Sequence, residues 1–451
     1  MKKYMQRLFL ILISALAMTL LFACGKKEKE VSGQSGVGEQ IRAGIEKSEE
    51  KEQERPTASS EGEKGEISRE EEKTAAINEQ TEQASSDQTT QEKETNESVV
   101  EKEVKGPEEI RDIPSTELVK EIIIGWNLGN TLDATAGGNS LKSETSWGNP
   151  LTTKAMITAV KEAGFQTLRV PTSWGNHLGE GPDYKIDPAW LDRVQEIVDY
   201  GIENDMYVIL NMHHEEWHFP SYDNLEQAKT ILTTVWAQIA DRFQNYDEHL
   251  IFEAMNEPRM KGTPYEWTGG NAESRDVINQ LNAAFVETIR NAPGNNPLRH
   301  LMLPCYAASS DPKTWADFII PEDDKIIVSI HAYTPYHFAL NMNGTSEWSL
   351  DRESDRREID MLMNNIYDNF ISKGQPVILG EFGAMKKKDN LDARVAWAEY
   401  YVKKATEKGI PCIWWDNGAF YGGGELFGLL NRRYLKWEYP EIVEALMRGL
   451  K

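Results

Sequence analysis

Two glutamates in the sequence stand where paired acid–base chemistry is possible. Glu257 lies in an Asn-Glu-Pro tripeptide and Glu381 in a Gly-Glu-Phe-Gly tetrapeptide, and each follows an apolar run. Two carboxyl groups can divide the work of bond cleavage when one donates a proton and the other, ionised, attacks carbon. This division is what the cleavage of a glycosidic bond requires.

Other polar and aromatic residues also follow apolar runs. Arg169 is the cation expected to keep one of the two carboxyl groups ionised, and Asn256 puts an amide beside Glu257. A salt bridge in a loop would explain any one such residue. A set is harder to explain that way, because charged groups at the ends of buried strands cost desolvation free energy unless they are paired or used. The further members of the set are Asn127, His213, His331, Tyr333 and Trp414.

Eight apolar runs and the amphipathic segments between them must position these side chains. Apolar strands that alternate with helices indicate a parallel sheet buried on both faces. Eight such units over 113–451 predict an α/β protein with a (β/α)8 TIM barrel, in which functional residues gather at the C-terminal ends of the strands. The predicted strands are 122–126, 167–170, 207–212, 250–254, 301–304, 326–330, 377–380 and 411–415, and the clearest helices are 189–204, 228–243, 272–291, 355–373 and 391–408.

An open, doubly wound sheet is the alternative architecture. It lacks support because no glycine-rich dinucleotide fingerprint follows any of the runs.

A histidine-rich segment raises the alternative of a zinc site. His214, Glu215 and His218 match the spacing of a His-Glu-x-x-His motif, which needs a helix to bring both imidazoles to one side. The segment follows a strand and runs into Phe219 and Pro220, so a helix is not expected there. We therefore expect neither a metal nor a cofactor.

The first 24 residues are typical of an export signal. Lys2, Lys3 and Arg7 precede an apolar run over 8–22, which is short for a membrane span. The end of this segment resembles a bacterial lipoprotein signal, in which Cys24 becomes the lipidated N-terminus. The alternative is an ordinary signal cut near Ala23, which would release a soluble secreted enzyme.

Residues 25–112 are predicted to form a disordered linker. They contain no Phe, Trp or Tyr and are rich in Glu, Lys, Ser and Gln, so they cannot bury enough apolar surface to offset the entropy of ordering. The formal net charge of the whole chain is −24, which argues against nucleic acid as a partner. Cys305 and Cys412 lie on apolar runs and are expected to be buried thiols.

The two glutamate motifs resemble the signatures of glycoside hydrolase family 5, in clan A. The segments 125–133, 144–150 and 414–418 are similar to those of its subfamily 4 endoglucanases, and the resemblance covers 115–448. It implies retaining chemistry, with Glu257 as general acid/base and Glu381 as nucleophile. Retention requires the two carboxyl groups to lie about 5 Å apart.

The same resemblance implies roles for the surrounding residues. Arg169 and Tyr333 would lie beside Glu381, and His331 beside Glu257. Asn256 would bind the 2-hydroxyl of the sugar at the cleavage point. The residues implied to contact that sugar or its neighbours are His213, Trp414 as a stacking platform, Asn127, and then Trp147, Trp174 and Trp217.

The implied substrate is a β-1,4-linked plant polysaccharide: cellulose, mixed-linkage glucan or xyloglucan. A β-mannanase with the same chemistry is the nearest alternative, and a non-catalytic glycan-binding lipoprotein is the alternative from another class. The presence of both carboxylates argues against the latter. We expect a monomer.

Overall fold

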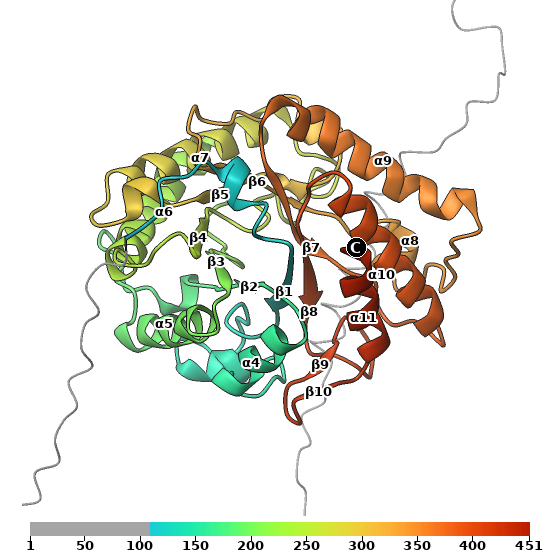
Figure 1. The fold of residues 1–451 in the computed structure, drawn as a ribbon. Helices are drawn as coiled ribbons and strands as arrows, with labels where there is room; N and C mark the ends of the chain where they lie inside the picture. The colour runs from blue at the N-terminus through green and yellow to red at the C-terminus, as the bar shows by residue number, and fades with distance from the viewer. Residues whose placement is uncertain (1–108) are drawn as a thin grey trace, which may run out of the picture.

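Eight parallel strands form one closed barrel with helices packed around it (Figure 1). The structure, a computed structural model, describes residues 109–451. The signal segment with Cys24, and the linker up to residue 108, lie outside the described residues. The strands are β1 (Ile124–Leu128), β2 (Thr167–Val170), β3 (Tyr207–Asn211), β4 (Leu250–Glu253), β5 (Leu301–Ser309), β6 (Ile326–His331), β7 (Val377–Phe382) and β8 (Cys412–Asp416).

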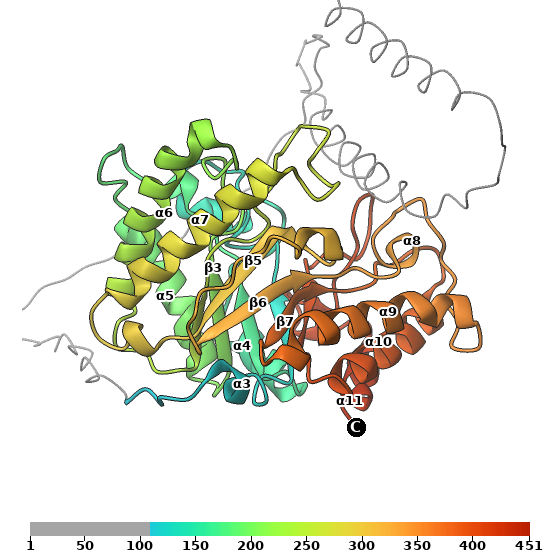
Figure 2. The same cartoon turned by 90° about the horizontal axis from the view of Figure 1, so that it is seen from above.

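The helices that follow the strands form the outer layer, and the predicted TIM barrel is confirmed. Figure 2 shows α9, α10 and α11 side by side on one flank of the barrel. The helices are α3 (Ser115–Leu118), α4 (Lys154–Glu162), α5 (Pro188–Ile202), α6 (Tyr222–Arg242), α7 (Ala272–Arg290), α8 (Tyr336–Ala339), α9 (Glu353–Asn369), α10 (Leu391–Thr406) and α11 (Pro440–Gly449); the short strands β9 (Leu430–Asn431) and β10 (Lys436–Trp437) pair beside the barrel.

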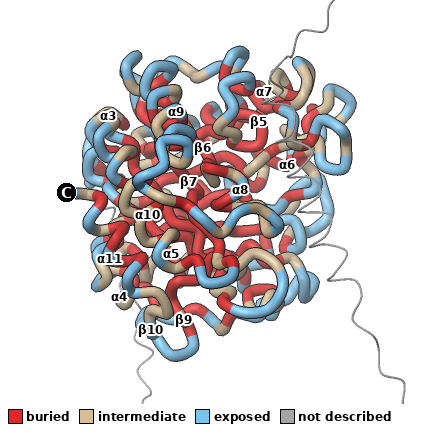
Figure 3. Tube along the Cα trace, turned by 90° about the vertical axis from the view of Figure 1, so that its right-hand side faces the viewer, coloured by how far each residue is buried: buried red, intermediate tan, exposed pale blue. Residues whose placement is uncertain are grey.

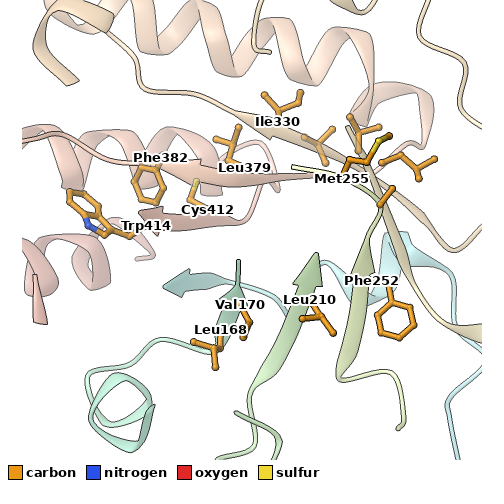
Figure 4. Packing of buried hydrophobic residues seen from close by; sticks show 14 of the residues in the cluster. Leu168, Val170, Leu210, Phe252, Met255, Ile330, Leu379, Phe382, Cys412 and Trp414 are labelled. Carbon is orange, nitrogen blue, oxygen red and sulfur yellow. The ribbon is translucent and has the colours of Figure 1, made fainter. Parts of the chain in front are cut away.

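Side chains alternate along each strand between the barrel interior and the helix layer. Ile209, Ile251 and Ile413 belong to the cluster inside the barrel, whereas Leu168 and Leu210 pack outward with the helices (Figure 4). The strands are buried along their length, and exposed residues lie on loops and outer helix faces (Figure 3). Cys305 and Cys412 are buried free thiols, as expected. Of the helices described, none is long and apolar enough to cross a membrane.

The N-terminal ends of the strands are closed by the start of the folded chain. Leu118, from α3, packs against the lower layer of the barrel interior. Ile110 is buried, and Arg111 donates to the buried carboxylate of Glu248, which lies just before β4. Among the described residues, packing against the barrel therefore begins at Ile110.

One strand is longer than its apolar run. The run ends at Pro304, but β5 continues to Ser309 through an irregularity in its pairing with β6. Ala307 and Ala308 adopt positive φ angles of 54° and 44° there. A bulge of this kind redirects the strand at the barrel rim, and single-residue propensities do not reveal it.

Candidate active site

The guanidinium of Arg169 joins the strands at the centre of the barrel mouth. Its side chain is fully buried, and its donors are all directed at neighbouring strand ends. Nε donates to Glu253 Oε2 at 2.8 Å, Nη1 to Asn127 Oδ1 and Glu381 Oε1 at 2.9 Å each, and Nη2 to Asn256 Oδ1 at 2.8 Å. Strands β1, β2, β4 and β7 are thereby locked in register at the mouth.

Glu253 is a buried carboxylate that sequence reasoning missed. It accepts from Arg169, from Asn211 Nδ2 at 3.0 Å and from Ser329 Oγ at 2.5 Å. A buried carboxylate needs such partners because transfer from water is costly. The sequence could have identified Glu253, because it lies inside an apolar strand run and a charge there must meet an opposite charge within the barrel.

Glu381 ends strand β7 with both carboxylate oxygens held. Oε1 accepts from Arg169, and Oε2 accepts from the hydroxyl of Tyr333 at 2.8 Å. Burial beside the Glu381 carboxylate raises the pKa of Tyr333 well above its ordinary value, so the phenol stays a donor. The residues expected beside Glu381 therefore lie in contact with it.

Glu257 follows strand β4 and faces His331, which ends strand β6. The His331 Nδ1 lies 2.8 Å from Glu257 Oε1, and Arg259 Nη1 lies 3.5 Å from Glu257 Oε2. Burial opposes ionisation of Glu257, but the hydrogen bond from His331 and the charges of His331, Arg259 and His214 outweigh burial and lower its pKa to about 2. Burial likewise lowers the pKa of His331, and the two carboxylates reverse that effect and raise it.

The two glutamates are close enough to act on the same bond. A carboxylate oxygen of Glu257, a ring nitrogen of His331 and a carboxylate oxygen of Glu381 all lie within 4.8 Å of one another. The longer separation of about 6.5–9.5 Å leaves room for a water on the far face of the sugar, whereas the shorter one suits direct attack by the second carboxylate. The arrangement therefore matches a double displacement.

Asn127 and Asn256 differ in whether the side-chain amide nitrogen still has a free N–H donor. Asn127 is fully buried, its Oδ1 accepts from Arg169, and its Nδ2 donates to the carbonyl of Gly380 at 2.9 Å. It therefore holds the strands together and does not reach a ligand. Asn256 accepts from Arg169 through Oδ1, and its amide nitrogen has no partner among the described residues, so it can donate to a bound molecule.

The parallel rings of Trp415 and His213 lie at the barrel mouth. The Trp415 ring lies 5.7 Å from the His213 ring, centroid to centroid, with an interplanar angle of 2°. Both residues are nearly buried, and His213 also lines a pocket that includes Glu257. An apolar ring face of this kind suits the C–H face of a sugar.

The prediction that Trp414 is the stacking platform is wrong. Trp414 is fully buried, its Nε1 donates to the carbonyl of Phe427 at 3.1 Å, and its ring packs against Phe382 and Trp397 in the helix layer (Figure 4). Side chains alternate along a strand, so Trp414 points outward and Trp415 points into the barrel mouth.

Of the three further tryptophans, one is also in the core. Trp174 is fully buried and donates to the carbonyl of Asn211 at 2.9 Å, so it does not line a subsite. Trp147 and Trp217 are half-buried at the rim, and the Trp147 ring lies 5.6 Å from that of His214. These two remain available to a ligand.

The segment His214–Glu215–His218 is a loop, as expected, and not a helix. The Glu215 carboxylate accepts from the backbone N–H of Trp174 at 2.6 Å and from Trp217 Nε1 at 2.7 Å. It serves to hold this loop against the one after β2.

Comparisons with known proteins agree with this geometry. Residues 132–421 match the family profile described as Cellulase (glycosyl hydrolase family 5). Endoglucanase B of Neocallimastix patriciarum is 51% identical over 76% of this chain and 74% of its own, and endoglucanase A of Ruminococcus albus is 46% identical over 76% and 94%.

This chain is also similar to solved structures of family 5 enzymes. A GH5-4 broad specificity endoglucanase from Ruminococcus champanellensis with bound cellotriose is 52% identical, with a TM-score of 0.73, over 75% of this chain and all of its own. A mutant of a glycoside hydrolase 5 lichenase from Caldicellulosiruptor sp. F32, in complex with cellotetraose, is 47% identical with a TM-score of 0.72, over 77% of this chain and 98% of its own.

Proposed function

The chain belongs to glycosyl hydrolase family 5, and from this premise we propose that it is a retaining endo-β-1,4-glucanase. Its substrates are internal bonds of cellulose, mixed-linkage glucan or xyloglucan. Relatives described as endoglucanases, and solved relatives that hold cellotriose or cellotetraose, support a β-glucan over other polymers. The observation that carries the proposal is the approach of Glu257 and Glu381 to within 4.8 Å.

In the first step Glu381 attacks the anomeric carbon while Glu257 protonates the leaving oxygen. Arg169 and Tyr333 hold the attacking carboxylate at a fixed angle, which lowers the entropy cost of reaching the transition state. In the free enzyme the proton that Glu257 later donates lies on His331. His331 is then an imidazolium and Glu257 a carboxylate. A bound polysaccharide excludes water from Glu257, which favours the neutral carboxyl and moves the proton across the 2.8 Å bond.

In the second step water replaces the leaving sugar. Glu257, now ionised, takes a proton from that water, and the water oxygen attacks the anomeric carbon. The ester bond to Glu381 breaks and its carboxylate returns to the ion pair with Arg169. The low pKa of Glu257 in the free site means that this carboxylate is ionised and able to accept a proton.

The remaining residues bind the sugar at the cleavage point. Asn256 donates its free amide N–H to the 2-hydroxyl, a contact that strengthens as charge develops in the transition state. His213, which lines the pocket beside Glu257, binds hydroxyls of this sugar. Trp415 supplies the stacking face that the family resemblance assigned to its neighbour in the strand.

The first experiment is a polysaccharide panel. The purified chain is incubated with carboxymethylcellulose, mixed-linkage glucan, xyloglucan, xylan and mannan, and new reducing ends are counted. We expect hydrolysis of the glucans, with loss of activity in Glu257→Gln and in Glu381→Gln. A preference for mannan would keep the mechanism and change the substrate. Glucan binding without hydrolysis would support a non-catalytic binding protein.

We also propose that the protein is exported and anchored at the cell surface through a lipid on Cys24, with 25–112 as a spacer. The first described residues support this arrangement, since Ile110 and Arg111 lie at the end of the barrel opposite to Glu257 and Glu381. Labelled fatty acid should enter the protein expressed in a bacterial host, and Cys24→Ser should abolish the label. A label that persists in that variant would refute the anchor.

We also propose that the protein is a monomer. Light scattering of the purified protein should give the mass of a single chain.

A further inference from the structure

Asn211, the last residue of strand β3, lies between the buried carboxylate of Glu253 and the imidazole of His213. Its Oδ1 accepts from the backbone N–H of Thr172 at 3.1 Å. Its Nδ2 lies 3.0 Å from Glu253 Oε2 and 3.2 Å from His213 Nδ1. The amide cannot turn over, because Oδ1 would then face the Glu253 carboxylate and the Thr172 N–H would lose its acceptor. Nδ2 therefore donates one hydrogen to Glu253 and the other to His213.

His213 holds a single ring proton in this environment. Burial, followed by the charges of His214 and Arg169, lowers the pKa of His213 well below its ordinary value. A neutral imidazole has one nitrogen that donates and one that accepts. Nδ1 accepts from Asn211, so the ring proton must lie on Nε2.

The plane of the His213 ring is fixed as well as its proton. The ring lies parallel to that of Trp415, with an interplanar angle of 2° and 5.7 Å between the centroids. The backbone N–H of His213 donates to the carbonyl of Thr172 at 2.8 Å. The Nε2–H group therefore has one direction at the barrel mouth.

Nε2 of His213 forms no hydrogen bond with the residues that the structure describes. A carboxylate oxygen of Asp133 lies within 4.8 Å of a ring nitrogen of His213. That carboxylate accepts instead from the backbone N–H groups of Asn130 at 3.0 Å and Thr131 at 2.6 Å. The Nε2–H group is thus available to a bound molecule.

We propose that Asn211 is a positioning residue that keeps the proton of His213 on Nε2, so that His213 donates to a hydroxyl oxygen of the bound sugar and does not accept from it. The inference rests on the proposed function and deepens it. The opposite tautomer would present a lone pair to the sugar. Glu253 takes part only by holding the Asn211 amide in place.

Nitrogen-15 NMR of the full chain with labelled histidine tests the tautomer directly. A ring nitrogen that carries hydrogen and one that does not differ clearly in chemical shift. We expect the His213 signals to show a bare Nδ1 and a protonated Nε2 at neutral pH, with His213→Gln used to assign them. A protonated Nδ1 would overturn the inference.

Asn211→Asp replaces the donor to Nδ1 by an acceptor of the same shape. We expect the ring proton to move to Nδ1 and kcat/KM for cellotetraose to fall about tenfold, because Nε2 then lacks the hydrogen that the sugar oxygen accepts. Asn282→Asp is the matched control. Asn282 is also fully buried, and its Nδ2 donates to the carbonyl of Pro304 at 2.9 Å. This control also buries a new carboxyl group, but it should leave the His213 signals and the rate unchanged.

The outcomes separate this inference from the proposed function. A lower rate with unchanged His213 signals would overturn it, because Asn211 would then act through Glu253 or through folding. An unchanged rate after the proton has moved would show that His213 does not donate to the sugar. If the unaltered chain has the expected tautomer but hydrolyses no glucan, the proposed function fails and the tautomer stands.

Asn211→Ala is the second variant if Asn211→Asp does not fold by circular dichroism. It removes the donor to Nδ1 and adds no charge beside Glu253. We expect the His213 signals of this variant to show a mixture of both tautomers. Signals identical to those of the unaltered chain would overturn the role of Asn211.

Discussion

The hydroxyl of Tyr333 donates to Oε2 of Glu381 at 2.8 Å, on the carboxylate oxygen that Arg169 does not bind. Each oxygen of the proposed nucleophile thus has its own donor, one neutral and one charged. The carboxylate cannot turn about its last bond without losing one of them. Its orientation is set before any substrate arrives, which is the condition for efficient attack on the anomeric carbon.

Tyr333→Phe should therefore lower the rate of cleavage with little effect on folding. Hydrogen bonds to charged groups contribute about 1.5–3 kcal/mol, so we expect kcat/KM to fall about tenfold to a hundredfold. Tyr222→Phe is the control, since it removes a similar bond to Asp276 at 3.0 Å between α6 and α7. Equal rates in Tyr333→Phe and in the unaltered chain would show that Arg169 alone orients Glu381.

Glu253 should contribute more to stability than surface carboxylates do. Its ion pair with Arg169 at 2.8 Å is fully buried, and breaking such a pair costs on the order of 3–5 kcal/mol because the remaining charge stays buried. Glu253→Gln keeps the shape and removes the charge. The control is Glu399→Gln, which breaks a pair with Arg448 at 2.9 Å that is nearly half exposed and should cost at most about 1 kcal/mol.

Urea unfolding followed by tryptophan fluorescence measures both free energies. If the two variants lose similar stability, the Arg169 network does not hold the strand ends together as we infer.

Adjacent tryptophans of strand β8 should give opposite results when each is replaced by alanine. Trp414→Ala empties a site in the helix layer and should lower the free energy of unfolding by about 3–5 kcal/mol. Trp415→Ala removes the stacking face at the mouth and should mainly raise KM on oligosaccharides. Thermal unfolding and steady-state kinetics on both variants test the pair. A stable, inactive Trp414→Ala would return the stacking role to Trp414.

The barrel and the polar residues of the site could be predicted from the sequence, whereas the roles of Trp414 and Trp415 could not. The eight apolar runs, their order and the polar residues after them predicted the barrel, and Arg169, Asn256, Glu257, His331 and Glu381 do meet at its mouth. Those residues could be selected because each is polar at a strand end, where burial demands a partner.

Apolar residues at strand ends offer no such signal. Trp414 and Trp415 differ only in the parity of their position, and one step along a strand changes the face of the sheet. The parity depends on the register with β1, in which Trp414 lies opposite Trp126 and Trp415 opposite Asn127. Asn127 points inward to Arg169, so a register built from the polar partners would have identified Trp415.

Glu425 leads to a prediction about pH. It lies half-buried in the loop after β8, where Asn417 Nδ2 donates to its backbone carbonyl at 2.8 Å. Burial, followed by the charges of Glu257 and Glu381, raises its pKa from 4.5 to about 7. Its side chain accepts no hydrogen bond from the residues that the structure describes. The ionised form is therefore less favourable in the folded state than in the unfolded chain.

The sign of the effect on stability follows from proton counts. Between pH 4.5 and about 7 the folded state holds more protons on Glu425 than the unfolded chain does, so stability falls as pH rises through this window and stays lower above it. Glu425→Gln removes the penalty. With a discount for its partial contact with water, we expect the variant to be more stable by about 1–2 kcal/mol at pH ~8 and nearly unchanged at pH ~4.

Unfolding free energies of both proteins across this range test the prediction. Glu347→Gln is the control, because the Glu347 side chain is 77% exposed and its charge is hydrated in both states. Its effect on the free energy of unfolding should be small. If the difference between Glu425→Gln and the unaltered chain does not change with pH, the Glu425 carboxylate is not forced to ionise beside the two glutamates. If Glu425→Gln is more stable but less active, the Glu425 carboxylate contributes to activity at a cost in stability.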